Sequence, residues 1–348
     1  MEWKPVTIDE VFTIGPGKRL EKRNMVEGMR PFIGASDSNN GITAFVGNTN
    51  ESLDRNVLGI NYNGSVCETF YHPYECVFTD DVKRLHLRDV QDDRDLLLFA
   101  GRCIHQQKRK YEYAYKFNEQ RMKRQTIILP TDAEGNPDWE YMSTYAEAMR
   151  QSLLERYKLY VAKRIAELEY RDIPSLDEVE WGRFKVFADG YLDIATTNSS
   201  IDGIKLIDGA DDVVPYVTRS DKSNGIARFV SKSNFCFGSD SGGCITVGLD
   251  TQTAFWQPTR FVTGQNIQVI TGEVLNEHVA MFLIPLFVMQ MRAKFNWGGN
   301  GATLGRMRKL EMVLPVDADG EPDWEYMEQF GENMMLKKYQ QYLDYAEK

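Results

Sequence analysis

The sequence predicts an α/β (α+β) fold built twice in tandem, each copy a mixed twisted sheet with helices that ends in a long helix. The segment DAEGNPDWEYM at residues 132–142 recurs as DADGEPDWEYM at residues 317–327, with nine of eleven positions identical. Upstream, PFIGASDSNNGITAFV from Pro31 recurs as PYVTRSDKSNGIARFV from Pro215, with eight of sixteen identical. Two long matches in the same order, at offsets of 185 and 184 residues, indicate a duplicated structural unit.

The length and composition agree with two ordinary domains. A chain of 348 residues can bury two cores, and 42% hydrophobic with 12% aromatic residues excludes a disordered chain. We expect no signal peptide and no membrane span, because no apolar run reaches about 18 residues. Five cysteines without a C-x-x-C pair and four histidines without ligand spacing predict no disulfide framework and no metal site, as in a cytoplasmic protein.

Each copy begins with short strand-like runs separated by turn residues. Examples are residues 57–62, 126–129 and 266–270. The segments Ser36–Gly41 and Ser220–Gly225 contain Asn-Gly after Ser-Asp, which is first of all a tight-turn pattern. They are also candidate contact surfaces, and only the second has cations around it, at Arg219, Lys222 and Arg228.

A long helix is expected at the end of each copy. Asp138 and Asp323 are positioned to cap it, and apolar residues then recur every three or four positions. In the first copy these are Met142, Tyr145, Met149, Leu153, Tyr157, Val161, Ile165 and Leu168. This stripe either packs on its own domain or pairs antiparallel with the second helix, which would create a pseudo-twofold axis. About 28 helical residues extend ~42 Å, roughly twelve base pairs of DNA.

The charge distribution predicts a polyanionic binding partner, although the net charge of the chain is -10. Residues 105–125 contain seven basic and two acidic residues, and residues 292–309 contain five basic and no acidic residue, so both windows have a net charge of +5. The acidity concentrates in residues 316–348, with nine acids and three lysines. Basic side chains neutralise phosphate, and Arg, Asn and Gln also read base edges, so the same part of each copy is predicted to contact DNA.

The candidate DNA-contacting residues follow from these windows. In the first copy they are Lys108, Arg109, Lys110, Lys116, Arg121, Lys123 and Arg124; in the second they are Arg292, Lys294, Asn296, Asn300, Arg306 and Arg308. The alternative interpretation is that each basic window is a solvent-exposed charged face without a binding function. Tyr111, Tyr113 and Tyr115 could also form the inner face of a strand with only the cations outward. The second copy has seven extra residues within WGGNGATLG, residues 297–305, expected as a surface loop and lacking the lysine of a P-loop.

These features together resemble the DNA-specificity subunits of type I restriction-modification systems. The resemblance rests on the two-copy plan, on Trp3 and Trp181, and on short motifs in a shared order, namely VFTI at 11–14, IGAS at 33–36, NGI at 40–42, NYNGS at 61–65 and Leu129-Pro130. It covers essentially the whole chain. The chain is shorter than a usual type I subunit, and DAxGxPDWEYM replaces a proline-rich run, which makes it more similar to the type IIB specificity subunits.

The resemblance implies a non-catalytic subunit with two target-recognition domains that read a bipartite double-stranded DNA site. It implies a first recognition domain at 1–131, a spacer helix and linker at 132–172, a second recognition domain at 173–316 and a second spacer helix at 317–348. Methyltransferase subunits, and a restriction subunit or function, would be its partners, and S-adenosylmethionine and Mg would belong to them rather than to this chain.

The sequence lacks the motifs of the main enzymatic alternatives. A methyltransferase would need a cofactor loop and an Asn/Asp-Pro-Pro-aromatic motif, and Asn136-Pro137-Asp138-Trp139 resembles the latter only superficially. A nuclease built from scattered carboxylates and lysines has no motif in its favour. The acidic balance leaves open a stand-alone DNA-binding protein or an inhibitor of a defence system.

Overall fold

A computed structural model describes residues 1–111, 116–295 and 301–346. They form two compact units, Met1–Tyr157 and Lys158–Lys348, here called unit 1 and unit 2. Each unit has its own buried core and is described by itself. Among the residues described, no helix combines the length and the apolar character that a membrane crossing requires.

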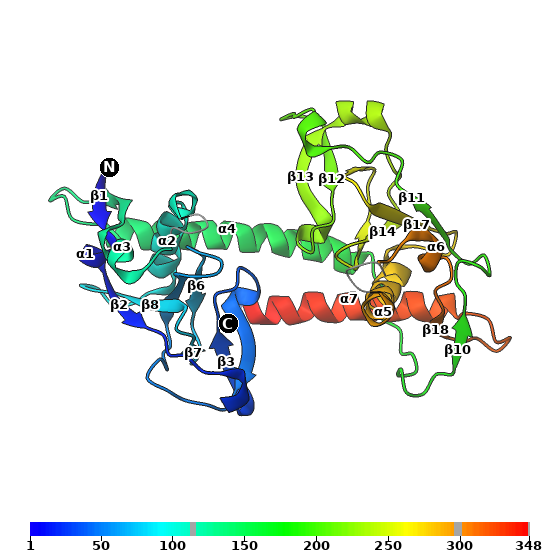
Figure 1. Cartoon of the computed structure of the whole chain (residues 1–348), viewed down its shortest axis with the longest axis horizontal. Helices are drawn as coiled ribbons and strands as arrows, with labels where there is room; N and C mark the ends of the chain where they lie inside the picture. Colours follow the sequence, from blue (N-terminus) through cyan, green and yellow to red (C-terminus); the bar gives the residue numbers. More distant parts are fainter. Residues whose placement is uncertain (112–115, 296–300, 347–348) are drawn as a thin grey trace. The chain divides into compact units, whose positions relative to one another are not determined.

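Unit 1 contains three small sheets (Figure 1). The largest is antiparallel in the order β2 (Phe12–Pro16), β8 (Val82–Leu87), β5 (Val57–Asn61) and β6 (Thr69–His72). The second joins β4 (Ile42–Val46), β3 (Glu27–Ile33) and β7 (Val77–Phe78), and its β3–β7 pair is parallel. The third pairs β1 (Glu2–Thr7) with β9 (Thr126–Thr131).

Helix α2 (Arg94–His105) packs on β5 and β6, with the short helices α1 (Ile8–Val11) and α3 (Glu119–Arg124) nearby. Short 3-10 turns lie at Lys22–Asn24, Asn39–Gly41 and Lys108–Lys110. The main core lies between α2 and the largest sheet, and a smaller core with Ile33, Val57 and Phe78 joins the two larger sheets. Strand β5 is buried at all five positions, because it lies inside the largest sheet and between both cores.

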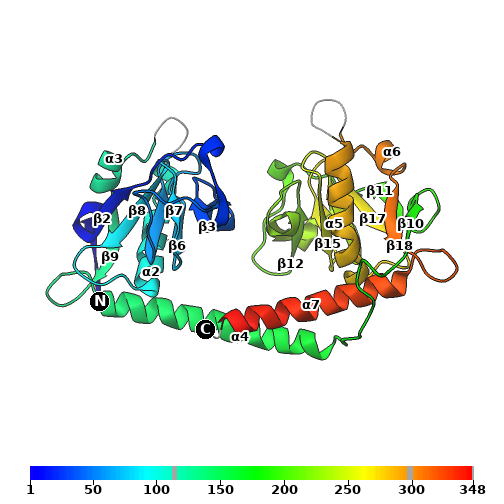
Figure 2. The same ribbon diagram turned by 90° about the horizontal axis from the view of Figure 1, so that it is seen from below.

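Unit 2 repeats this plan, which confirms the predicted duplication. Its sheets follow the orders β11-β17-β14-β15, β13-β12-β16 and β10-β18, again with one parallel pair, β12–β16. The elements are β10 (Trp181–Phe184), β11 (Asp193–Thr196), β12 (Val213–Val217), β13 (Ile226–Ser231), β14 (Cys244–Gly248), β15 (Thr253–Gln257), β16 (Val262–Thr263), β17 (Ile267–Thr271), α5 (Glu277–Lys294), α6 (Leu304–Met307) and β18 (Met312–Pro315), with 3-10 turns at Gly203–Lys205, Ser223–Gly225 and Lys232–Phe237. Helix α5 lies against β15, as α2 lies against β6 (Figure 2). The single mixed sheet expected for each copy is in fact three sheets.

The two long helices are α4 (Trp139–Ala166) and α7 (Trp324–Ala346). The predicted caps are confirmed, because Asp138 accepts a hydrogen bond from the Tyr141 amide at 2.9 Å and Asp323 accepts one from the Tyr326 amide at 2.8 Å. The apolar stripe of α4 is not one continuous buried face. Met142 and Val161 are buried, but Tyr145, Met149 and Leu153 are 47%, 49% and 58% exposed.

Within unit 2 the end of α4 and the linker after it run antiparallel to α7. The rings of Tyr160 and Tyr339 meet edge to face at 6.3 Å. Further along the chain, Gln329 donates to the Glu169 carbonyl at 2.8 Å, and the Tyr326 hydroxyl donates to the Pro174 carbonyl at 2.9 Å. The numbers rise in one segment as they fall in the other, so the predicted antiparallel pairing of helices holds for the end of α4 up to Ala166, and linker residues up to Pro174 continue along α7.

Candidate nucleic-acid interface

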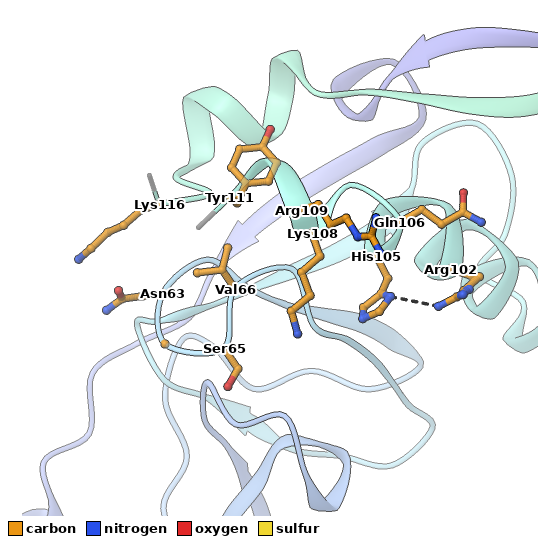
Figure 3. Close-up of a pocket in the computed structure, with 11 residues that line it drawn as sticks. Asn63, Ser65, Val66, Arg102, His105, Gln106, Lys108, Arg109, Tyr111 and Lys116 are labelled. Atoms are coloured by element: carbon orange, nitrogen blue, oxygen red, sulfur yellow. Dashed lines mark hydrogen bonds between the residues drawn. The ribbon is translucent and has the colours of Figure 1, made fainter. Parts of the chain in front are cut away.

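Unit 1 has a pocket of about 1200 Å³ where the first basic window meets the β5–β6 loop. Figure 3 shows Lys116 and Asn63 at one side of it and Lys108 with His105 at the other. Its lining residues are Asn63, Gly64, Ser65, Val66, Arg102, His105, Gln106, Lys108, Arg109, Tyr111 and Lys116. Among the described residues, the lining contains four lysine or arginine side chains and no carboxylate, as expected of a surface that binds an anion.

The end of α2 and the turn after it place the basic residues. Asp93 caps α2 by accepting hydrogen bonds from two backbone amides at its start. The chain then forms the 3-10 turn Lys108–Lys110, whose three side chains are exposed. Tyr111, directly after the turn, anchors it to the core, because its ring centroid lies 4.2 Å from that of Phe117 and its hydroxyl donates to Gln125 at 2.6 Å.

Of the three alternating tyrosines only Tyr111 lies within the described residues, so the strand interpretation of residues 111–115 stays a prediction. Tyr111 is buried at the end of a 3-10 turn, and Lys108, Arg109 and Lys110 lie within that turn instead of alternating along a strand. Tyr113 and Tyr115 lie outside the described residues.

Glu68 organises the cations at one wall of the pocket. Its carboxylate pairs with Lys108 and lies 3.4 Å from His105 Nε2, and only 15% of its side chain is exposed. The Arg102 guanidinium lies 3.1 Å from His105 Nδ1. A nearly buried carboxylate held between Lys108 and His105 restricts the positions of both side chains.

Beside the pocket, the Ser36–Gly41 segment forms the turn expected from its sequence. Asn39 and Asn40 have φ of 50° and 53°, and the Asn40 amide donates to the Tyr71 carbonyl at 3.1 Å. Asn224 repeats this in unit 2, with φ of 58° and a 3.4 Å hydrogen bond to the Trp256 carbonyl. The structural interpretation of both segments is therefore confirmed.

The remaining basic residues of the first window lie on α3. Lys123 pairs with Glu119 at 3.1 Å, and Arg124 donates to the Gln120 carbonyl at 3.2 Å. Arg121 donates to the Lys116 carbonyl, which joins α3 to the pocket wall. The described part of the window is thus divided between pocket residues at 105–111 and 116 and a short helix at residues 119–124.

In unit 2 the second window follows the same elements. Arg292 and Lys294 are exposed in the last turn of α5, and Lys294 Nζ lies 3.5 Å from the Glu311 carbonyl. Arg306 on α6 donates to the Gly301 carbonyl at 2.9 Å, and Arg308 reaches the Ile194 carbonyl at 3.5 Å. Asn296 and Asn300 lie outside the described residues.

The glycine-rich insertion is only partly the surface loop expected from its sequence. Residues 297–300 are outside the described part of the chain, whereas Ala302 is 0% exposed and its carbonyl accepts a hydrogen bond from Gln268 at 3.3 Å. Leu304 and Gly305 already belong to α6. Alanine is small and apolar, so this end of the insertion packs into the core.

Of the three cations around the second turn, Arg219 lies nearest to the basic end of α5. It pairs with Asp250 in the β14–β15 loop, and Gln252 of that loop donates to the Phe295 carbonyl at 2.9 Å. Lys222 is exposed in the turn itself. Arg228 lies elsewhere, because it pairs with Asp208 at 3.2 Å and donates to the Gly203 carbonyl at 3.1 Å.

Sequence reasoning missed five polar residues of the pocket: Asn63, Ser65, Arg102, His105 and Gln106. Arg102 and His105 carried a usable signal, since they are basic residues of the last turn of α2, where the helix dipole favours cations, directly before the turn Lys108–Lys110. Within residues 1–111, 116–295 and 301–346, no three His, Cys, Asp or Glu side chains are grouped to hold a metal ion.

The chain is similar in sequence to one family of known proteins. Residues 1–156 and 202–343 match the family model described as type I restriction modification DNA specificity domain. A curated relative, the type II restriction enzyme BgcI specificity subunit S.BcgI of Heyndrickxia coagulans, is 54% identical over 156 residues, which are 45% of this chain and 46% of the relative. The match thus spans about half the length of that relative.

Two solved structures are similar over nearly the whole chain. The type I restriction-modification S subunit from M. genitalium is 12% identical with a TM-score of 0.45, covering 100% of this chain and 91% of its own. The HsdS subunit from Thermoanaerobacter tengcongensis is 12% identical with a TM-score of 0.31, covering 99% and 90%. Both scores lie below 0.5, so the assignment rests on the family model, whose two matched segments together cover well over half of the residues. The chain belongs to the type I restriction modification DNA specificity domain family.

Proposed function

We propose that this chain recognises a bipartite double-stranded DNA site as the specificity subunit of a restriction-modification complex. The observation that carries the proposal is a duplicated framework with a basic segment after the equivalent helix of each unit, at the ends of α2 and α5. Phosphate contacts position a protein on DNA and polar contacts to base edges give it specificity, so each unit would read one half of the site.

The domain plan is part of this proposal. The first recognition domain is residues 1–131 and the second is residues 173–316, with spacer segments at 132–172 and 317–348. The antiparallel contacts of α7 with the end of α4 and with the linker after it support an antiparallel spacer, which is helix against helix up to Ala166 and linker against helix up to Pro174. A pseudo-twofold arrangement of the two domains would then set the gap between the half-sites.

Catalysis is assigned to partner subunits. The printed name of the curated relative describes a specificity subunit of a restriction enzyme, which favours a complex in which another polypeptide methylates and cleaves. We assign S-adenosylmethionine and Mg to that partner, and we favour the type IIB branch over a type I complex.

Two measurements test the proposal together. The full chain, co-expressed with the methyltransferase encoded beside its gene, should co-purify with it, and sequencing of methylated DNA from that host should give one split site. A chain that binds an intact foreign restriction enzyme and produces no methylated site would instead be an inhibitor, and the proposal would be wrong.

A further inference from the structure

We propose that the loop between β5 and β6, residues 62–67, is the base-reading element of unit 1, with Asn63 and Ser65 as its reading groups. Lys108, Arg109 and Lys116, on the other segments around the same pocket, contact phosphate. This inference rests on the proposed function and deepens it, because it separates the residues that give specificity from those that give affinity.

The two polar side chains of the loop have hydrogen-bonding capacity to spare. Asn63 donates its amide to Asp81 at 2.9 Å, which fixes the side chain, and its Oδ1 accepts no hydrogen bond from the described residues. Ser65 uses its backbone amide toward the Ala35 carbonyl at 3.4 Å, and its hydroxyl makes no side-chain hydrogen bond within the described part of the chain. A carbonyl oxygen and a hydroxyl are groups that accept from the exocyclic amines of adenine or cytosine.

The loop holds these groups in one arrangement. The Cys67 amide donates to the Asn61 carbonyl at 2.9 Å, and the Cys67 side chain is fully buried. Gly64 has a φ of +62°, and a Cβ at this position would lie 2.9 Å from the Ala35 carbonyl oxygen. The loop is therefore closed at its base and packed against the Ser36–Gly41 turn, so its reading groups are preorganised.

The loop of unit 2 that corresponds to residues 62–67 differs from it in length and contacts, whereas the strands on either side are paired in the same antiparallel way. Strands β14 and β15 form an antiparallel hairpin as β5 and β6 do, but four residues, 249–252, separate the last pair Gly248 and Thr253, in place of the eight, 61–68, that separate Ile60 and Thr69. In that loop Asp250 pairs with Arg219, and Gln252 donates to the Phe295 carbonyl. Two copies of one frame with unlike loops at the same position are expected of a protein that reads two different half-sites.

The test uses the full chain co-expressed with its methyltransferase and compares Ser65→Ala, Asn63→Ala and Lys116→Ala. Each loop variant should lower the preference for the correct base at one or two positions of a single half-site by roughly 5- to 150-fold, because a good polar contact to a base gives discrimination of that size. Lys116→Ala should reduce methylation of every site and leave the recognised sequence unchanged. Asn136→Ala, an exposed asparagine away from the pocket, is the matched control.

A second readout separates loss of specificity from loss of fold. Binding of the purified full chain to the wild-type site and to a scrambled duplex should show a smaller ratio of affinities for Ser65→Ala, with an unchanged affinity for the scrambled duplex. Equal losses on both duplexes, or wild-type base preference in both loop variants, would overturn the inference while the wild type still methylates a split site. A wild type that methylates no split site would refute the proposed function itself.

Discussion

Arg121 donates its guanidinium Nη1 to the backbone carbonyl of Lys116, five residues earlier, at 2.7 Å. Arg306 makes the same contact in unit 2, where Nη1 donates to the Gly301 carbonyl, also five residues earlier, at 2.9 Å. Both arginines stand at the same place on the short helices α3 and α6. Because the contact recurs in both units while the sequences before it differ in length, we assign these arginines to anchoring the basic segments.

The anchoring role predicts that charge alone does not replace Arg121. Lysine keeps the positive charge but lacks the planar fork that reaches a carbonyl while keeping donors for other partners. Arg121→Lys should therefore weaken binding to the recognised site about as much as Arg121→Ala does, in titrations of the full chain with labelled duplex. Wild-type affinity in Arg121→Lys, with a loss only in Arg121→Ala, would show that Arg121 acts as a phosphate contact.

Phosphate contacts in unit 1 are predicted at Lys110 and Lys116, whose side chains are exposed. Each contact to phosphate releases counterions, so Lys110→Ala or Lys116→Ala should lower affinity for all duplexes and reduce the slope of log K against log salt by about one unit. Lys337→Ala on the acidic helix α7 is the control and should leave the slope unchanged. If the double variant Lys110→Ala, Lys116→Ala keeps the wild-type slope of log K against log salt, this surface does not contact DNA phosphates.

His86 predicts how the stability of the protein depends on pH. Its Nε2 lies 3.0 Å from Asp54, in the segment before β5, and its Nδ1 lies 2.6 Å from Asp92, in the loop after β8. The hydrogen bond to Asp54, and then that to Asp92, raise the pKa of His86 to about 9 from 6.5, against the opposing effect of burial. The protonated imidazole thus joins two acidic loops of unit 1.

A raised pKa in the folded state stabilises the protein below the unfolded pKa and loses that effect as the pH rises through the folded value. The free energy of unfolding should therefore decrease by about 2 kcal/mol between pH 6.5 and pH 9, after allowance for solvent screening. Urea titrations across this range measure it, and His86→Gln should flatten the profile. An equal decrease in wild type and His86→Gln would assign the effect to other groups.

The junction between α4 and the rest of unit 2 depends on Arg164. Its guanidinium donates to Glu277 at 2.6 Å at the start of α5 and reaches the Tyr339 hydroxyl at 3.5 Å on α7. Arg164→Ala leaves a partly buried carboxylate without its partner and should lower the free energy of unfolding by about 2 kcal/mol. Arg171→Ala, which breaks an exposed pair with Glu169, is the control and should not change it. Equal stability of both variants would show that the junction does not depend on this contact.

The parts of the fold that depend on local sequence patterns were predictable. The repeat at 132–142 and 317–327 predicted the duplication, and Asp138 with Asp323 predicted the starts of α4 and α7. The division into three sheets was not predictable, because the parallel pairs β3–β7 and β12–β16 join segments more than 40 residues apart, and no local period reports such contacts. The exposure of Met149 likewise depends on tertiary packing that an apolar stripe does not specify.

Only part of the candidate site was predictable, because contacts between segments far apart in the sequence leave no local pattern. A charge window selects residues that are near in sequence, so it found Lys108 and Lys116 and missed Asn63 and Ser65, which reach the same pocket from a loop about 45 residues earlier. Proximity in sequence to the Ser220–Gly225 turn also grouped Arg228 with Arg219, although their ion-pair partners, Asp208 and Asp250, lie in different parts of unit 2. Sequence proximity therefore identified the basic segments but not the surface that they build.

The central claim is that each unit reads one half of a split DNA site. Residues 173–316 can be exchanged for the corresponding segment of a relative with a different recognised sequence, and the methylated sites of the host mapped by sequencing. The account predicts that one half-site changes to that of the relative while the other half-site is retained. Methylation of a site changed in both halves, or unchanged in both, would contradict it.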